Sequence, residues 1–421
     1  MEKSEQLQQP VFSSSQAPAA HTDHKKLLFL LIPAVILLIA AISFTVYSFL
    51  HNANNQSEYI FSEGLLPAKT ANKWGYINQK GTYAIEPKFD ATSAFKNGIA
   101  AVCENNKYGF INTKGTYIIS PQFDDASVFS HDLAAVKSDG KWGYINTDGD
   151  FVIKPQFDDA SPFTDDGLAC VERYGYYGYI DKSGSFVIDP NFANAFSFRN
   201  GIAVIENGDQ QKGLLDSNGK QLTSLQFSTL SSVSFRGLRV ASVHDKYGYL
   251  NEQGTFAISP IYDYVMSFSD TDDLAAVEKD NKWGYINSNG QMMIDSHFNL
   301  AGRFVNGYAV AESGQDFGII NTDGTFVVQP QYDYLGDLNV YSPVTYYKKG
   351  NKYGYLDVNG KIITDAKFDA LQTYSYIPDT VGMFHNDGLC IVKENGKFGV
   401  IDSAGKYVIK PQFDGLYCYE N

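Results

Sequence analysis

The chain has 421 residues, of which 44% are hydrophobic and 19% charged, a balance that excludes wholesale disorder. Its 33 basic and 47 acidic side chains give a formal net charge of -14, and no basic stripe interrupts the acidic sequence, so nucleic-acid binding is not expected. Four cysteines are too few for a disulfide-stapled fold.

An apolar segment near the amino end predicts a single-pass membrane anchor. Residues 27–50 contain no charged side chain, and at about 1.5 Å per residue they can cross a hydrocarbon core of about 30 Å. Lys25 and Lys26 precede this segment and the next basic residue is Lys69, which indicates that the amino end stays on the cytoplasmic side of the cell membrane. A cleaved signal peptide is the alternative. We expect a disordered cytoplasmic tail over 1–24, a transmembrane helix over 27–50, a polar stalk over 51–60 and extracellular repeats over 61–421.

From residue 61 onward the sequence repeats one unit ten times. Close copies of Lys-Trp-Gly-Tyr-Ile-Asn begin at Lys73, Lys141 and Lys282, and weaker copies lie between them. A marker glycine recurs every 34 to 36 residues, except for a last interval of 45, whose excess predicts a loop insertion around 374–380. The markers are Gly75, Gly109, Gly143, Gly178, Gly213, Gly248, Gly284, Gly318, Gly354 and Gly399.

Each unit predicts three short strands. Asn or Asp follows the marker by three residues and Gly follows three later, as in Asn78 and Gly81, which closes a hairpin because the Asx side chain bonds the turn and Gly adopts a positive φ. The second strand is β-branched and ends in most units at a proline such as Pro121. A core aromatic residue follows, and a third apolar run such as 99–102 leads into the next unit. Because one unit cannot bury enough apolar surface, neighbouring units must supply the core.

These residues carry a family resemblance. The pattern K-W-G-[YF]-I-[ND]-x-x-G-x-[YF]-x-I-x-P-x-[FY]-D resembles the WG, or KWG, repeat of bacterial proteins over about residues 72–421. Lys212 replaces the aromatic residue and Leu225 the proline, so the fifth unit is the weakest match. The resemblance implies a repeat architecture found in surface, membrane-anchored and secreted proteins, and it implies no shared catalytic residues.

The predicted fold class is all-β, built from tandem three-stranded repeats. We favour an open β-repeat array over a closed propeller, because propeller blades usually have four strands in about 40–45 residues and number about 4 to 8. One pattern favours the propeller. Residues 61–66 resemble a third strand ahead of the first unit, and the last unit stops after Phe413 and Asp414, so that the two ends could complete one blade.

Catalytic and metal-binding signals are weak. The repeated Asx-x-x-Gly offers one side chain where calcium needs six or more oxygens, and the histidines outside the tail lack zinc spacing. A glycosidase would need one pair of carboxylates in a unit that differs from the other nine, and no aspartate pair stands out in this way. We therefore expect no enzyme, no metal and no cofactor. The pairs are Asp124-Asp125, Asp158-Asp159, Asp165-Asp166 and Asp272-Asp273.

Three of the cysteines are expected to pack in the core. Cys103, Cys170 and Cys390 fall in third-strand runs where other units carry Ala or Val. A bridge between Cys390 and Cys418 is the alternative in an oxidising exterior.

The aromatic residue before each marker is the candidate binding feature. Trp74, Trp142 and Trp283 could form a ladder that stacks on sugars or on apolar groups of a partner, although core packing explains their constant phase better. We expect a membrane-anchored extracellular β-repeat scaffold that binds a protein or cell-envelope partner without catalysis. A carbohydrate-binding or cell-wall-binding module is the alternative function.

Overall fold

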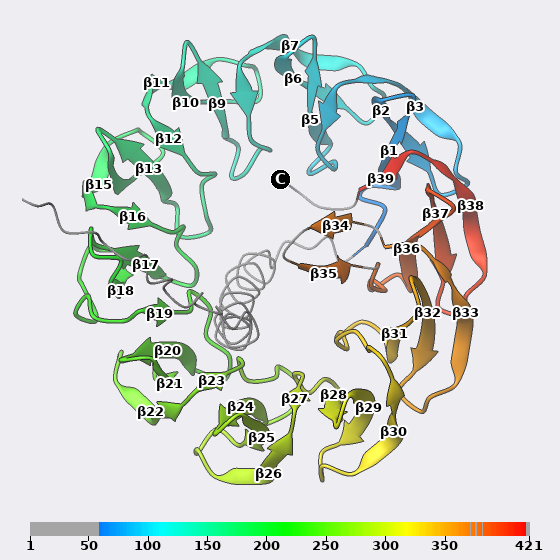
Figure 1. Ribbon diagram of the computed structural model, residues 1–421. Helices are drawn as coiled ribbons and strands as arrows, with labels where there is room; N and C mark the ends of the chain where they lie inside the picture. The colour runs from blue at the N-terminus through cyan, green and yellow to red at the C-terminus, as the bar shows by residue number, and fades with distance from the viewer. Residues whose placement is uncertain (1–58, 371, 375–376, 381, 418–421) are drawn as a thin grey trace, which may run out of the picture. The chain divides into compact units, whose positions relative to one another are not determined.

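Small antiparallel sheets follow one another around a closed ring in the computed structural model, which describes residues 59–370, 372–374, 377–380 and 382–417 (Figure 1). We call these sheets blades 1 to 10 in chain order. A complete blade contains a short inner strand, an inner long strand, a marker strand that carries the marker glycine, and an outer strand. The chain is thus an all-β propeller-like repeat protein across its described residues.

The strands of the blades have the following bounds. The short inner strands are β39 (Gly415–Leu416) in blade 1, then β4 (Ala91–Thr92), β8 (Asp125–Ala126), β12 (Asp159–Ala160), β16 (Asn194–Ala195), β19 (Thr229–Leu230), β23 (Tyr264–Val265) and β27 (Leu300–Ala301) in blades 2 to 8. The inner long strands of blades 1 to 10 are β1 (Leu65–Thr70), β5 (Ile99–Glu104), β9 (Ala134–Ser138), β13 (Ala169–Arg173), β17 (Ile202–Glu206), β20 (Arg239–Val243), β24 (Ala275–Lys279), β28 (Tyr308–Ser313), β31 (Val344–Lys349) and β36 (Leu389–Glu394).

The marker strands of blades 1 to 10 are β2 (Lys73–Asn78), β6 (Lys107–Asn112), β10 (Lys141–Ile145), β14 (Tyr176–Ile180), β18 (Lys212–Asp216), β21 (Lys246–Leu250), β25 (Lys282–Ile286), β29 (Asp316–Asn321), β32 (Lys352–Asp357) and β37 (Lys397–Asp402). The outer strands are β3 (Tyr83–Phe89), β7 (Tyr117–Phe123), β11 (Phe151–Phe157), β15 (Phe186–Phe192), β22 (Phe256–Tyr262), β26 (Met292–Phe298), β30 (Phe326–Tyr332), β33 (Ile362–Phe368) and β38 (Tyr407–Phe413). In blade 5 the outer position holds isolated bridges such as Leu215 to Gln221.

The boundaries of the blades do not coincide with those of the sequence units. The short strand that follows the core aromatic residue of one unit crosses to the next sheet, so β4 pairs with β5 rather than with β3. This two-residue strand was not predicted from the sequence, whose pattern indicates three strands per unit. The sheet order from ring centre to edge is clearest in blade 7, where β23, β24, β25 and β26 lie side by side (Figure 1).

Each hydrophobic core is shared by two neighbouring blades. In one cluster, Tyr144, Ile153 and Phe157 of blade 3 pack with Ala169 and Val171 of blade 4. Tyrosine side chains strengthen the same junctions, because a buried hydroxyl donates a hydrogen bond to a carbonyl just after the short strand of the next blade. These bonds include Tyr144 to Ser161 (2.8 Å), Tyr179 to Phe196 (2.8 Å), Tyr249 to Met266 (2.7 Å) and Tyr285 to Gly302 (2.8 Å).

The ring closes where the two ends of the repeat region meet. β39 pairs antiparallel with β1, with Leu416 opposite Ala68, and the Asp414 amide donates to the Lys69 carbonyl over 2.8 Å. Phe61 and Leu66 share one core with Phe413 and Leu416. The predicted open array is therefore wrong, and the pattern at the two ends that favoured a propeller is confirmed. Closure is possible because β1, the first inner long strand, has no preceding repeat to supply its short strand, so β39 pairs with it.

The marker glycine fits a bulge in the neighbouring outer strand. Tyr76 pairs with Ile85 but Trp74 pairs with Phe89, so the outer strand carries extra residues opposite the marker. A Cβ on Gly75 would lie 2.4 Å from the Ile85 carbonyl oxygen. Pro87 lies within β3 rather than at its end, which corrects the predicted strand end; an outer strand tolerates proline because its other edge has no ladder partner.

Two other local predictions have different outcomes. The Asx-x-x-Gly hairpin is confirmed: Asn78 Oδ1 accepts from the Lys80 amide over 2.9 Å, and Gly81 has φ of 75°. The predicted loop insertion instead contains a separate two-stranded sheet, formed by β34 (Gln372–Tyr374) and β35 (Ile377–Thr380).

The predicted tail (1–24), transmembrane helix (27–50) and most of the polar stalk (51–60) lie outside the described residues. Within the part of the chain that the structure describes, no helix has the length and apolar character needed to cross a membrane.

Ring closure predicts that a residue near the carboxyl end behaves like one in the middle of the chain. Leu416 and Leu230 occupy the same place in their short strands, opposite Ala68 and Ala241, and are 8% and 7% exposed. We expect Leu416→Ala and Leu230→Ala each to lower the free energy of unfolding by about 2–4 kcal/mol, measured by urea denaturation. A negligible effect of Leu416→Ala beside a large effect of Leu230→Ala would contradict closure.

Candidate functional site

The three predicted tryptophans lie in the marker strands of three different blades, at blade junctions. Trp74 and Trp142 are half-buried, whereas Trp283 is 8% exposed and belongs to the core between blades 7 and 8. The Trp74 ring meets Tyr417 edge-on, and the Trp283 ring meets Tyr264 in the same way. The structure therefore does not bring the three tryptophans together, and each takes part in local packing.

In several blades, the amino group of a lysine on the inner long strand lies over the aromatic ring that precedes the marker glycine. Lys69 Nζ lies 5.7 Å from the centre of the Trp74 ring, and Lys137 Nζ lies 5.9 Å from that of Trp142. Both distances allow an attractive cation–π contact. The same contact joins Lys348 to Tyr353 at 5.5 Å and Lys393 to Phe398 at 5.2 Å. Stacking of a ligand on these rings stays a prediction, and a ligand would have to share or displace the lysine.

One residue per blade lies directly across from the residue that precedes the marker glycine, on the inner long strand. This position is at the end of the blade where a tight turn joins the inner long strand to the marker strand, and we call the ten residues the rim. They are Lys69, Cys103, Lys137, Glu172, Glu206, Ser242, Glu278, Glu312, Lys348 and Lys393 in blades 1 to 10. The sequence pattern reveals the aromatic residue but not the rim residue across from it, because that partner follows only from the pairing register.

The charged rim side chains are all half-buried. Glu206 forms an ion pair with Lys212 over 3.2 Å in blade 5, where lysine replaces the aromatic residue. Burial raises the pKa of Glu278, and nearby Asp263 adds to the effect. Burial also raises the pKa of Glu312, although Lys282 opposes it. The rim thus presents side chains of different charge in one repeated geometry.

A recurrent ion pair fixes the position of six of the ten rim turns. The lysine that begins a marker strand pairs with the aspartate that follows the core aromatic residue, and the second oxygen of that aspartate accepts a hydrogen bond from a turn amide of the next blade. Asp263, for example, binds Lys246 and the Asp280 amide, the latter over 2.7 Å. We call this arrangement the Lys–Asp clasp. The ion pairs are Lys73–Asp90, Lys107–Asp124, Lys141–Asp158, Lys246–Asp263, Lys352–Asp369 and Lys397–Asp414.

The last clasp spans the ring closure. Asp414 binds Lys397 of blade 10 and accepts from the Ala71 amide of blade 1 over 2.8 Å. In blade 7 the clasp is replaced by amide chemistry, since Lys282 Nζ donates to Asn299 Oδ1 over 2.9 Å and Asn299 Nδ2 donates to the Gly314 carbonyl over 2.8 Å. The contacts beneath the rim therefore continue across the ends of the repeat region, although ion pairs in some blades are replaced by amide hydrogen bonds in another.

These observations assign a structural role to three of the aspartates considered as catalytic candidates. Asp124 and Asp158 are members of clasps, and Asp272 Oδ1 accepts from the Gly307 amide over 2.9 Å in the next blade. Among the described residues, no three His, Cys, Asp or Glu side chains are grouped so that they could hold a metal ion. Asp124, Asp158 and Asp272 therefore link neighbouring blades. Asp125 and Asp159 each accept a hydrogen bond from the amide of the following residue, and Asp166 Oδ2 is buried without a hydrogen-bond partner in the described part of the chain.

The cysteine predictions are confirmed where the structure describes them. Cys103, Cys170 and Cys390 are all buried, and burial raises the pKa of Cys170 to about 12, so its thiol stays protonated at neutral pH. The Cys390 thiol lies 3.2 Å from the Tyr355 hydroxyl. Cys418 lies outside the described residues, so the alternative bridge to Cys390 stays a prediction.

Comparison with protein families identifies the repeat. A family described as the WG containing repeat matches residues 74–108, 108–142, 142–177, 177–210, 247–283, 283–315, 317–353, 353–376 and 398–421, which is more than half of the chain. The chain belongs to the WG repeat family. The unmatched stretch 211–246 contains Lys212 and Leu225, the departures that mark the weak fifth WG repeat, and it includes the position where blade 5 lacks a regular outer strand.

No curated protein sequence matches this WG repeat chain. Among solved structures, a eukaryotic initiation factor aligns at 12% identity with a TM-score of 0.45, over 84% of this chain and 97% of that one. The computationally designed Ika8 protein aligns at 12% identity with a TM-score of 0.32, over 64% and 93% of the two chains. BamB from Moraxella catarrhalis aligns at 11% identity with a TM-score of 0.31, over 70% and 91%. The assignment rests on the WG repeats themselves.

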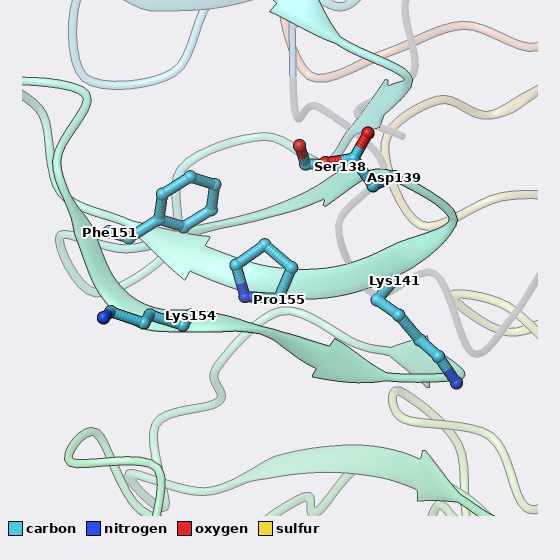
Figure 2. Close-up of a pocket in the computed structure, with 6 residues that line it drawn as sticks. All are labelled: Ser138, Asp139, Lys141, Phe151, Lys154 and Pro155. Atoms are coloured by element: carbon cyan, nitrogen blue, oxygen red, sulfur yellow. The ribbon is translucent and has the colours of Figure 1, made fainter.

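A cavity of about 420 Å³ lies on blade 3, between the rim turn and the outer strand. Figure 2 shows Phe151 and Pro155 on one side and Ser138 and Asp139 on the other. The amino groups of Lys141 and Lys154 point in opposite directions rather than into a common centre (Figure 2). Specific small-molecule sites gather several polar groups around the ligand, and this cavity does not.

Core packing at the tryptophan position predicts unequal effects of truncation. We expect Trp283→Ala to lower the free energy of unfolding by about 3–5 kcal/mol, because it empties a buried site, and half-buried Trp142→Ala to cost less. Urea denaturation followed by circular dichroism measures both. Equal, small costs would show that neither ring is part of the core.

The clasps predict a specific loss of stability in acid. The Lys246 side chain and the Asp280 amide lower the pKa of Asp263 in the folded chain, so its contribution is complete above the unfolded value of about 3.9 and is lost as pH falls below about 4 through the folded pKa. We expect Asp263→Asn to be less stable than wild type at pH 7 and to lose less stability than wild type between pH 5 and pH 3. Asp323→Asn, in an exposed turn at the other end of its blade, is the control and should follow wild type.

Proposed function

We propose that this WG repeat protein is a non-catalytic binding scaffold, anchored in the cell membrane with its repeats outside, that recognises a protein or a cell-envelope polymer through the rim. The observation that carries the proposal is the contrast between the repeated packing beneath the rim and the changing residue at the rim position. Hydrophobic cores and clasps hold the rim turns in place, while the residue at the rim position changes between Lys, Glu, Cys and Ser. A fixed frame with variable side chains at one face is typical of repeat proteins that bind macromolecules.

Several observations support a role without catalysis. The carboxylates in the clasps, the tyrosine hydroxyls and the buried cysteine thiols all take part in packing or in links between blades. The cavity on blade 3 does not gather polar groups. These groups hold the ring together, which suits a scaffold better than an enzyme.

The sequence supports the proposed anchor. Residues 27–50 carry no charge, and Lys25 with Lys26 on the amino side follows the rule that positive flanks stay in the cytoplasm. External protease on intact cells should digest the repeats and leave an amino-terminal epitope protected. Protection of both parts until the cells are lysed would contradict the proposed orientation.

Crosslinking on intact cells tests the binding function with the full chain. We expect one protein or one wall polymer to co-purify with the wild type, and its recovery to fall several-fold with the rim variant Lys137→Ala. Lys114→Ala, an exposed lysine in a turn at the opposite end of the neighbouring blade, is the matched control and should bind normally.

The outcome also separates the alternatives. Retention on purified wall polysaccharide that free sugar competes away, together with loss of retention in Trp142→Ala, would favour carbohydrate binding. Failure of the wild type to capture any partner, or equal recovery with both lysine variants, would contradict a scaffold that binds through the rim.

A further inference from the structure

The charges of the rim separate into two arcs around the ring. Lysines stand on blades 9, 10, 1 and 3, as Lys348, Lys393, Lys69 and Lys137. Glutamates stand on blades 4, 5, 7 and 8, as Glu172, Glu206, Glu278 and Glu312. Cys103 and Ser242, on blades 2 and 6, are the uncharged members and lie inside the lysine arc and the glutamate arc, respectively.

Ring closure creates this pattern. Along the chain the lysines fall into two groups at opposite ends of the repeat region, but the pairing of β39 with β1 places blade 10 beside blade 1. Charges beside the rim position are mixed. Lys349 follows Lys348 on blade 9, but Lys279 follows Glu278 on blade 7 and Glu394 follows Lys393 on blade 10. The division into a basic and an acidic side therefore belongs to the rim position itself.

A surface with two opposite charged halves is complementary to a copy of itself. In a symmetric dimer the same surface patch serves both subunits, so a two-fold axis in the plane of the ring can place the lysine arc of one copy over the glutamate arc of the other. We propose that two copies of this chain associate face to face through their rims, with blade 3 over blade 4, blade 10 over blade 7 and blade 9 over blade 8 of the partner copy.

This arrangement pairs opposite charges at each of those blade pairs. Lys137 faces Glu172, Lys393 faces Glu278 and Lys348 faces Glu312, and each pair occurs twice because the interface is symmetric. The remaining blade pairs set Lys69 over Ser242 and Glu206 over Cys103, without repulsion. A two-fold axis parallel to the ring face can take several orientations that place each blade of one copy over a blade of the other. This is the orientation in which no rim lysine faces a lysine and no rim glutamate faces a glutamate.

The chemistry of the rim favours a second copy over a partner of uniform charge. A uniformly acidic or basic partner would be attracted by one arc and repelled by the other, and like charges placed together weaken a complex strongly. The charged rim side chains are half-buried, and all except Glu206 lie across from an aromatic residue. Approach of a second face would remove them further from water, where each correctly placed opposite charge matters more.

Charge exchange between subunits tests the proposal. The full-length chain, purified in mild detergent, is examined by analytical ultracentrifugation at low and high salt. We expect a dimer whose dissociation constant rises with salt, because screening weakens the arcs. Lys393→Glu and Glu278→Lys should each weaken the dimer at least about tenfold, since each places two like-charge pairs in the interface.

Mixing these two variants provides the decisive measurement. In the mixed dimer, the new glutamate at position 393 of one copy meets the new lysine at 278 of the other, and the unchanged Glu278 and Lys393 meet as before, so dimerisation should return to the wild-type level. Lys410→Glu and Glu86→Lys make the same charge changes at exposed positions of outer strands and should leave the dimer unchanged.

The remaining outcomes are equally clear. A wild-type chain that stays monomeric, a dimer that is insensitive to Lys393→Glu and to salt, or a mixture that does not recover would each overturn the face-to-face rim dimer. Circular dichroism confirms that the variants fold, and Lys137→Glu with Glu172→Lys supplies an independent pair if either variant at blades 7 and 10 does not. Since this test measures self-association alone, its failure leaves the proposed binding of another partner to be decided by crosslinking on cells.

Discussion

The structure depends on the transfer of a two-residue strand from most repeats to the blade that follows. The short strand after the core aromatic residue pairs with the inner long strand of the following blade, and the core around it contains side chains from both blades. Neither blade can complete its sheet or bury its apolar face alone. Stability therefore resides in the junctions between repeats, as in other stacked-repeat proteins, and the ring gains one more junction than an open chain would have.

Closure also solves a problem that an open array would leave. In an open chain, the first repeat would expose the inner side of β1 and the last would expose β39. Pairing Leu416 with Ala68 satisfies both, and the clasp between Lys397, Asp414 and the Ala71 amide repeats the links found elsewhere in the ring. The outer strands remain as free edges, and prolines such as Pro155 within them remove amide donors that could recruit another strand.

The same regularity gives the rim its character. Marker glycine, bulge and clasp hold most rim turns at equivalent places, so that one side chain per blade can change without disturbing the packing beneath it. Lysine over an aromatic ring and glutamate beside one both fit this position. The variation in charge is then free to serve recognition, whether of another partner or of a second copy. The tryptophans, in contrast, contribute first to the packing that keeps the rim in place.

Sequence periodicity by itself determined the repeat, the all-β class, the Asx-Gly hairpins and the burial of aromatic residues such as Phe157, because each follows from local backbone chemistry or from an apolar pattern that recurs in fixed phase. It also located the aromatic side of the candidate surface in Trp74, Trp142 and Trp283. Only the tertiary structure decided closure, the fourth strand and the two charged arcs. A two-residue strand has too little pattern to be read along the chain, and the residue across from Trp142 is Lys137 only once the register is known. The arcs require even more, since Lys393 and Lys69 become neighbours only when the ends of the repeat region meet through pairing between residues far apart in sequence.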